Sequence, residues 1–136
     1  VMGETLDRTS IGQLGAGDVV NLERPMAAAG RFDGHIVQGH IDGVGTVRSV
    51  DADGEGSRMW VDVPADLMRY IVEKGSVTLD GVSLTVAGVD ETGLEVALIP
   101  HTLAVTTLGR RRPGEKVNLE VDVLAKYVER LLGAGR

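Results

Sequence analysis

The residues that could carry chemistry first gather in the segment GHIVQGHIDG at residues 34–43. Its two histidines, His35 and His40, are five residues apart, so on a strand they would point to opposite faces and would not clamp one metal ion. For His35 we favour a hydrogen bond within the fold, whereas His40 fits a structural role and a binding role equally well. The glycines allow the backbone to approach another strand or a flat ligand closely. The segment therefore predicts a ligand contact rather than a metal site.

A second group of candidates lies later in the chain. Ser83 and Thr85 would share one face of a strand, where their hydroxyls could hydrogen-bond the polar edge of a heterocycle. The run IPHTL at residues 99–103 directly follows an expected strand. Lys74 and Asp122 are single charges at the ends of expected elements, and their simplest interpretation is a helix-terminal charge and a helix cap. No catalytic triad, phosphate loop or dinucleotide fingerprint is visible in the sequence.

The chain contains one segment twice, 97 residues apart. Residues 3–23 match residues 100–120 at nine positions in an ungapped window of 21 residues, where chance would give about one or two matches. The matched pairs are Thr5 and Thr102, Leu6 and Leu103, Thr9 and Thr106, Gly12 and Gly109, Gly17 and Gly114, Val20 and Val117, Asn21 and Asn118, Leu22 and Leu119, and Glu23 and Glu120. We therefore expect the end of one domain followed by one complete copy of that domain.

Three consecutive arginines, Arg110, Arg111 and Arg112, could form an anion site in the second copy. The equivalent residues 13–15 of the first copy read QLG, so the basic run is not part of the repeated pattern. We therefore favour a solvated turn over an anion site.

Composition narrows the class of protein. A formal net charge of −6 argues against a nucleic-acid partner, whose phosphates favour clustered Lys and Arg. The absence of cysteine excludes disulfides and thiolate chemistry, and it suits a reducing compartment, so we expect a cytoplasmic protein without a signal peptide or membrane span. Nineteen glycines and few aromatic residues indicate many tight turns and an aliphatic all-β core.

Alternating runs and turn signals predict a β-sandwich or barrel. The expected strands are residues 44–50, 59–63, 94–99 and 116–121, together with a hairpin over residues 76–86. Asp80-Gly81 should form the type I′ turn of that hairpin, because this pair readily takes positive φ at both positions. Alternation places Val77, Leu79, Val82, Leu84 and Val86 in the core and leaves Ser76, Thr78, Ser83 and Thr85 on the other face.

Two helices are expected beside the strands. Pro64 and Gly75 bracket a short internal helix over residues 65–72. Apolar residues recur at helical spacing over residues 123–132, behind Asp122 as a candidate N-cap. The apolar face of this second helix could pack on its own barrel or on other subunits.

Five blocks of the sequence, in order and at the right spacing, resemble the riboflavin synthase family. They are VVNLER at residues 19–24, GHIVQGH at 34–40, KGSVTLDGVSLTV at 74–86, LIPHTLAVTTLG at 98–109 and VNLEVDVLAKYVERLL at 117–132. The resemblance implies two six-stranded antiparallel Greek-key barrels in tandem, with a C-terminal helix. Residues 1–23 would then end the N-terminal lumazine-binding barrel, whose opening strands are missing. Residues 24–122 would form the C-terminal lumazine-binding barrel, and residues 123–136 the oligomerisation helix.

The resemblance also implies a reaction. Two molecules of 6,7-dimethyl-8-ribityllumazine would dismutate by transfer of a four-carbon unit, giving riboflavin and 5-amino-6-(D-ribitylamino)uracil, without a metal or another cofactor. The implied partners are these ligands and two further copies in a homotrimer, and lumazine synthase is a candidate partner. A non-catalytic lumazine- or flavin-binding protein of the same fold is the main alternative, and an oligomeric barrel with a vestigial pocket is a third.

Carried over by position, the resemblance implies five catalytic residues, namely His40, Lys74, Ser83, Thr85 and Asp122. It implies that the complete barrel contacts lumazine through Gly39, His40, Ile41, Lys74, Ser83, Leu84, Thr85, Ile99, Pro100, His101, Thr102, Leu103 and Ala104. The remnant of the matching N-terminal site would be Val1, Met2, Gly3, Glu4 and Thr5. We expect Ser83, Thr85 and the backbone of residues 99–102 to hold the pteridine edge. His40, Lys74 and Asp122 would serve the ribityl chain or proton transfer.

Overall fold

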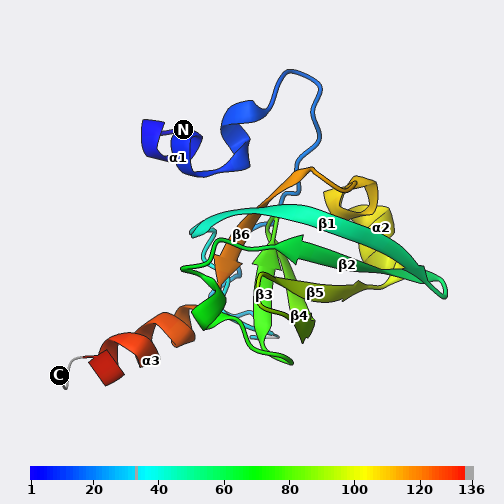
Figure 1. The fold of residues 1–136 in the computed structure, drawn as a ribbon. Coiled ribbons are helices and arrows are strands. Elements are labelled where there is room, and N and C mark those ends of the chain that lie inside the picture. The colour runs from blue at the N-terminus through cyan, green and yellow to red at the C-terminus, as the bar shows by residue number, and fades with distance from the viewer. Residues whose placement is uncertain (33, 134–136) are drawn as a thin grey trace.

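Alternating apolar and polar residues produce a closed barrel of six antiparallel strands in the computed structural model, which describes residues 1–32 and 34–133. Neighbouring strands follow the order β1-β2-β5-β4-β3-β6, and β6 pairs with β1 to close the barrel (Figure 1). The strands are β1 (Gly43–Asp53), β2 (Gly56–Asp62), β3 (Ser76–Leu79), β4 (Val82–Val89), β5 (Gly93–Leu98) and β6 (Lys116–Val121). The predicted all-β barrel and each of its predicted strands are confirmed.

Aliphatic side chains from the inward face of every strand fill the barrel. The buried hydrophobic residues are Val47, Met59, Val61, Val63, Leu67, Ile71, Val77, Leu79, Val86, Leu94, Val96, Leu98, Leu108, Val117, Leu119 and Val121. In the predicted hairpin, Val82 and Leu84 are half-buried and pack against this core. Thr78 is on the opposite face, as predicted, but it is fully buried because another segment covers it.

The β3–β4 turn has the predicted backbone conformation. Asp80 and Gly81 have φ of 47° and 80°, and Leu79 pairs with Val82 across the turn. Positive φ at both central residues is the geometry that matches the twist of a two-residue hairpin. The turn therefore fixes the register in which Thr78 faces Ser83.

Helical elements lie at the two ends of the barrel. They are α1 (Gly3–Arg8), η1 (Ser10–Gln13), η2 (Met68–Tyr70), α2 (Pro100–Val105), η3 (Thr107–Arg110) and α3 (Val123–Gly133), where η denotes a 3₁₀ helix. Among the described residues, every helix is too short or too polar to pass through a lipid bilayer.

The internal helix predicted over residues 65–72 forms only as the short 3₁₀ helix Met68–Tyr70. That segment forms a turn followed by the short η2, held by bonds that span three residues, such as Leu67 N to Pro64 O and Ile71 N to Met68 O. Leu67 and Ile71 both enter the barrel core, so tertiary packing decides the local conformation. Conversely, α2 was not predicted, although Pro100 at its first turn is a typical start signal.

The two segments 97 residues apart fold alike. Helix α1 and turn η1 in the first segment correspond residue for residue to α2 and η3 in the second. The hydroxyl of Thr9 donates to Thr5 O at 2.6 Å, and the equivalent hydroxyl of Thr106 donates to Thr102 O at 2.7 Å. The sequence match therefore reflects a shared helix-and-turn structure.

One glycine in each 3₁₀ turn, Gly12 and Gly109, leaves no room for a side chain. A Cβ at Gly109 would lie 1.9 Å from Leu103 O, and a Cβ at Gly12 would lie 2.5 Å from Leu6 O. Both distances are too short for any side chain, because the obstacle is backbone. After these turns the copies differ: the second continues into β6, whereas residues 19–24 of the first are extended without a strand partner.

Helix α3 begins directly after β6 and projects from the barrel (Figure 1). Asp122 accepts a hydrogen bond from Leu124 N at 2.9 Å, which is the predicted capping contact. Lys126 pairs with Asp42 at 2.5 Å and so ties the helix to the start of β1. The apolar face of α3 stays exposed, through Leu124, Tyr127, Val128, Leu131 and Leu132.

Arg48 on β1 joins three elements on the outer surface. Its guanidinium donates to Asp62 at 2.8 Å, to Asp90 at 2.5 Å and to Thr92 at 2.8 Å. It also lies 5.1 Å from the centre of the Trp60 ring. The hydrogen bonds from Arg48, and after them those from the backbone of Thr92, hold the pKa of Asp90 well below its ordinary value.

We predict that Asp90→Asn destabilises the protein in a pH-dependent manner. A carboxylate whose pKa is lowered in the folded state stabilises that state above its unfolded pKa, near 4, and loses this effect as pH falls through the lowered pKa. Urea unfolding from pH 7 down to pH 2 should therefore show a lower midpoint for the variant at pH 7, with the difference shrinking below about pH 4. Glu91→Gln, at the exposed neighbouring carboxylate, is the control. A difference of the same size at every pH would contradict the assigned role of Arg48.

Candidate functional site

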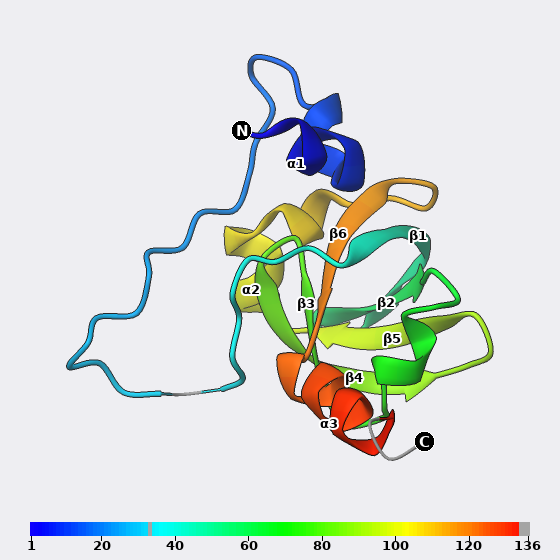
Figure 2. The same cartoon turned by 90° about the vertical axis from the view of Figure 1, so that its left-hand side faces the viewer.

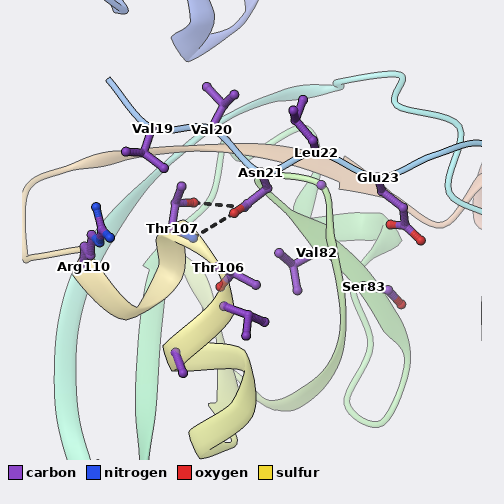
Figure 3. A pocket seen from close by; sticks show the side chains of 13 residues that line it. Val19, Val20, Asn21, Leu22, Glu23, Val82, Ser83, Thr106, Thr107 and Arg110 are labelled. Carbon is purple, nitrogen blue, oxygen red and sulfur yellow. Dashed lines mark hydrogen bonds between the residues drawn. The ribbon is translucent and has the colours of Figure 1, made fainter. Parts of the chain in front are cut away.

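An open cavity of about 420 Å³ lies where the β3–β4 turn, the end of α2 and residues 19–23 meet (Figure 3). It is lined by Val19, Val20, Asn21, Leu22, Glu23, Gly81, Val82, Ser83, Ala104, Val105, Thr106, Thr107 and Arg110. Its volume falls in the range of small-molecule sites, roughly 300 to 1,000 Å³. The mixture of aliphatic side chains with a few hydroxyls and one guanidinium suits a flat, partly polar ligand.

Asn21 fixes one wall of this cavity to the barrel. Its Oδ1 accepts from Thr107 N at 2.8 Å, and its Nδ2 donates to Thr107 Oγ1 at 2.9 Å and to Asp80 O at 2.8 Å. Figure 3 shows the two bonds between Asn21 and Thr107. Residues 19–23 are therefore held by both of the elements that form the opposite walls.

The carboxylate of Asp80 is the centre of the polar contacts behind the cavity. Asp80 Oδ1 accepts from Asn118 N at 2.8 Å, and Oδ2 accepts from the Arg111 guanidinium at 2.7 and 3.1 Å. The Asp80 side chain is 8% exposed, so these charge-assisted bonds are shielded from water. They join the β3–β4 turn to β6 and to the residue that follows η3.

A second polar cluster lies on the outer face of β3 and β4, beneath residues 34–42. Whereas residues 24–32 extend away from the barrel, residues 35–42 return along it (Figure 2). His35 Nδ1 lies 2.8 Å from Ser83 Oγ, and His35 Nε2 lies 3.1 Å from Thr78 Oγ1. Because Ser83 also lines the cavity, it connects the His35 imidazole to that space. A hydroxyl in this position can pass a proton between an imidazole and a bound ligand.

Glu120 on β6 anchors the same covering segment. Its Oε1 accepts from Gln38 N at 2.7 Å, and its side chain lies beside that of Thr78, which is its partner across the β3–β6 pairing. The other oxygen, Oε2, is buried without a hydrogen-bond partner among the described residues. Residues 34–42 are thus held to the barrel by hydrogen bonds at His35 and at Gln38. They do not form a strand, so the prediction that His35 and His40 lie on opposite faces of one strand does not apply.

The five residues expected to be catalytic do not form one cluster. Ser83 and Thr85 are both exposed on the same face of β4, and Ser83 lines the cavity whereas Thr85 does not. Lys74 is exposed near the other end of β3, with φ of 64°, a conformation uncommon outside glycine and often found at functional sites. His40 is exposed, with Nδ1 3.2 Å from Gln38 O, and Asp122 caps α3.

The expected contacts at residues 99–104 lie on α2 rather than in a loop. Ile99 is the N-cap and Pro100 the first residue of the helix, while Thr102 O accepts two bonds from Thr106. His101 is exposed, and Leu103 packs against the core. Ala104 is the member of this group that lines the cavity.

The remaining expected contacts are divided between three places. Gly39 and Ile41 line an adjoining cavity of about 240 Å³, which shares residues 19–21 with the first one. Leu84 points inward and packs against the core. The expected N-terminal contacts lie at the start of the chain and line none of the described cavities; they are Val1, Met2, Gly3, Glu4 and Thr5.

Sequence reasoning missed the wall formed by residues 19–23, and with it Asn21 and Thr107, and it assigned Arg110 to a solvated turn rather than to a cavity. The repeat pairs Asn21 with Asn118, and that equivalence was the available signal for a shared role. Periodicity could not reveal the contact, because Asn21 and Thr107 are 86 residues apart.

The arrangement suits binding and proton transfer. Within residues 1–32 and 34–133, no three His, Cys, Asp or Glu side chains lie close enough to hold a metal ion. The cavity offers hydroxyls, the Arg110 guanidinium and the Glu23 carboxylate, and the His35 imidazole is joined to it through Ser83.

Comparison with known proteins agrees with this description. The family of lumazine binding domains matches residues 38–122. Riboflavin synthase from Actinobacillus pleuropneumoniae is 50% identical over 132 residues, which cover 97% of this chain and 61% of that protein. Riboflavin synthase from Mycobacterium bovis is 50% identical over 135 residues, covering 97% of this chain and 67% of that protein. The chain thus spans about three fifths to two thirds of the length of these curated relatives.

A solved structure has the same fold. The crystal structure of LumP complexed with 6,7-dimethyl-8-(1'-D-ribityl) lumazine superposes with a TM-score of 0.79 at 21% identity, covering 88% of this chain and 64% of that one. At this level of identity the likeness establishes the fold, including the closed barrel.

We predict that Thr78→Val loosens the segment over the outer face. The substitution keeps the side-chain shape but removes the hydroxyl bound to His35, and a hydrogen bond contributes roughly 0.5 to 1.5 kcal/mol to the free energy of unfolding. Urea unfolding should show a loss of about 1 kcal/mol, and the amide of Gln38 should exchange its hydrogen faster. Thr85→Val, at an exposed threonine on β4, should change neither quantity. Unaltered exchange at Gln38 in the Thr78 variant would contradict this anchoring.

Proposed function

This chain belongs to the riboflavin synthase family of lumazine-binding domain proteins, and from that premise we propose that it acts in riboflavin formation. In the proposed reaction, two molecules of 6,7-dimethyl-8-ribityllumazine dismutate. One gives a four-carbon unit to the other, which yields riboflavin and 5-amino-6-(D-ribitylamino)uracil. The absence of cysteine supports a place in a reducing compartment, the cytoplasm.

One observation carries the proposal for this chain's own residues. The cavity of about 420 Å³ has a hydroxyl-bearing strand on one side and the end of α2 on the other. Ser83 offers a hydrogen bond to the polar edge of the pteridine, while Val82, Val105 and residues 19–20 offer apolar contacts to its faces. Arg110 and Glu23 lie at the same cavity and suit the hydroxyls of the ribityl chain.

The chemistry needs positioning more than strong catalytic groups. Holding two flat reactants face to face turns a bimolecular step into one that is effectively unimolecular, which can lower the barrier by about 7 to 11 kcal/mol. Proton transfer at the acidic methyl group of lumazine accounts for the remaining catalysis. The His35–Ser83 pair is the best-placed proton carrier, and His40, Lys74, Thr85 and Asp122 remain candidates.

A complete reaction centre requires a second lumazine site. We propose that residues 1–23 end a first barrel and that the N-terminal barrel of one subunit faces the C-terminal barrel of a neighbour. The exposed apolar face of α3 supports a homotrimer held by this helix. Val1 to Thr5 are equivalent to residues 98–102 by the repeat and would belong to the second kind of site.

A binding protein of the same fold is the second candidate. The described residues contain one closed barrel, which is enough to hold one lumazine but not two facing ones. In that case the chain would bind lumazine or a flavin without converting it.

We predict that the 136-residue chain binds lumazine but produces riboflavin slowly or not at all. Titration should change the fluorescence of 6,7-dimethyl-8-ribityllumazine as it enters the cavity, while riboflavin absorbance stays low because a facing site is incomplete. Rapid turnover by this chain alone would contradict the two-barrel requirement. A failure to bind lumazine would contradict the proposed function itself.

We also predict that Ser83→Ala weakens lumazine binding by about twofold to twelvefold, since loss of one ligand hydrogen bond costs roughly 0.5 to 1.5 kcal/mol. The same fluorescence titration measures the effect. Ser49→Ala is the matched control, because Ser49 lies on β1 and lines none of the described cavities. Equal affinity of the Ser83 variant for lumazine would contradict the proposed hydrogen bond between Ser83 and the pteridine edge.

A further inference from the structure

The sequence contains two asparagines, Asn21 and Asn118, and they occupy equivalent positions in the repeated segment. Asn118 Oδ1 accepts a hydrogen bond from Ser10 N at 2.7 Å, and Asn21 Oδ1 accepts one from Thr107 N at 2.8 Å. Ser10 and Thr107 are equivalent too, since each is the first residue of the 3₁₀ turn in its own copy. Each asparagine therefore binds the turn of the other copy.

These bonds complete the capping of both turns. The first amides of a helical turn have no partner inside that turn and need an acceptor from outside. In each copy the preceding threonine serves the second amide: Thr9 Oγ1 accepts from Ile11 N at 3.2 Å, and Thr106 Oγ1 accepts from Leu108 N at 3.3 Å. The first amide is left for the asparagine of the other copy.

Reciprocity of this kind is typical of a two-fold contact, in which residue i of one unit meets residue j of the other, and j of the first meets i of the second. We propose that Asn21 and Asn118 are exchanged caps that fix how the two copies of the repeated unit sit against each other. Asn21 of the first copy caps η3 of the second copy, and Asn118 of the second copy caps η1 of the first.

The cap formed by Asn21 also connects the contact between the two copies to the cavity. Residues 19–23 line the cavity, and Asn21 is the residue among them that bonds to η3 and to the β3–β4 turn. Asn21 is thus a positioning residue for the cavity wall. The repeat and these hydrogen bonds are independent of the proposed reaction.

Amide hydrogen exchange at Thr107 and Ser10 tests the two exchanged caps directly. Asn21→Ala should speed exchange at Thr107 N, 86 residues away, and Asn118→Ala should speed it at Ser10 N, 108 residues away. The expected change is about fivefold, which is typical of the loss of a helix cap. Gln13→Ala, at an exposed side-chain amide in η1, should leave both rates unchanged. Unchanged exchange at Thr107 in the first variant, or at Ser10 in the second, would overturn the proposal.

Because Asn118 is part of β6, a second variant removes the donor of the same hydrogen bond and leaves β6 unchanged. Ser10→Pro removes the amide that Asn118 binds, at the first position of a helical turn, where proline is tolerated. Because the chain has two asparagines, selective ¹⁵N-asparagine labelling gives one side-chain amide signal pair for each. The Asn118 pair should shift in Ser10→Pro and the Asn21 pair should not. A shift of the Asn21 pair alone, or of neither, would overturn the assignment.

Discussion

The buried carboxylate of Asp80 is the interaction on which the cavity depends. It holds the backbone of β6 through Asn118 N and the turn after η3 through Arg111, while the carbonyl of the same residue binds Asn21. A buried charge without partners is strongly destabilising, so these parts must come together for the hairpin turn to fold as it does. Asp80 therefore connects the hairpin turn that precedes Val82 and Ser83 with Asn21 of the cavity wall and with the residue that follows η3.

The repeated segment uses the same local structure for two purposes. In the second copy, α2 and η3 lead into β6 and complete the barrel. In the first copy, α1 and η1 lead into extended residues that lie along the barrel and form a wall of the cavity. The same helix and turn thus occur once before the strand that closes the barrel and once before the residues that line the cavity.

Local patterns predicted the barrel well. Period-2 alternation identified the strands, Asp80-Gly81 identified the hairpin turn, and helical spacing behind Asp122 identified α3. The patterns failed where distant contacts decide the conformation: residues 65–72 bend so that two side chains enter the core, and residues 34–42 lie on the barrel without becoming a strand. Four of the predicted ligand contacts line a cavity. They are Ser83 and Ala104 in the 420 Å³ cavity, and Gly39 and Ile41 in the adjoining one. The wall at residues 19–23 depends on contacts between residues 59 and 86 positions apart, which no local periodicity can reveal.

The central claim is that lumazine binds between β4, the end of α2 and residues 19–23. The most direct measurement is an NMR titration of the ¹⁵N-labelled chain with 6,7-dimethyl-8-ribityllumazine. We expect the largest amide shifts at Val82, Ser83, Ala104 to Thr107 and residues 19–23, because these groups line the cavity. Shifts confined to the other end of the barrel, around Lys74 and η2, would contradict the account.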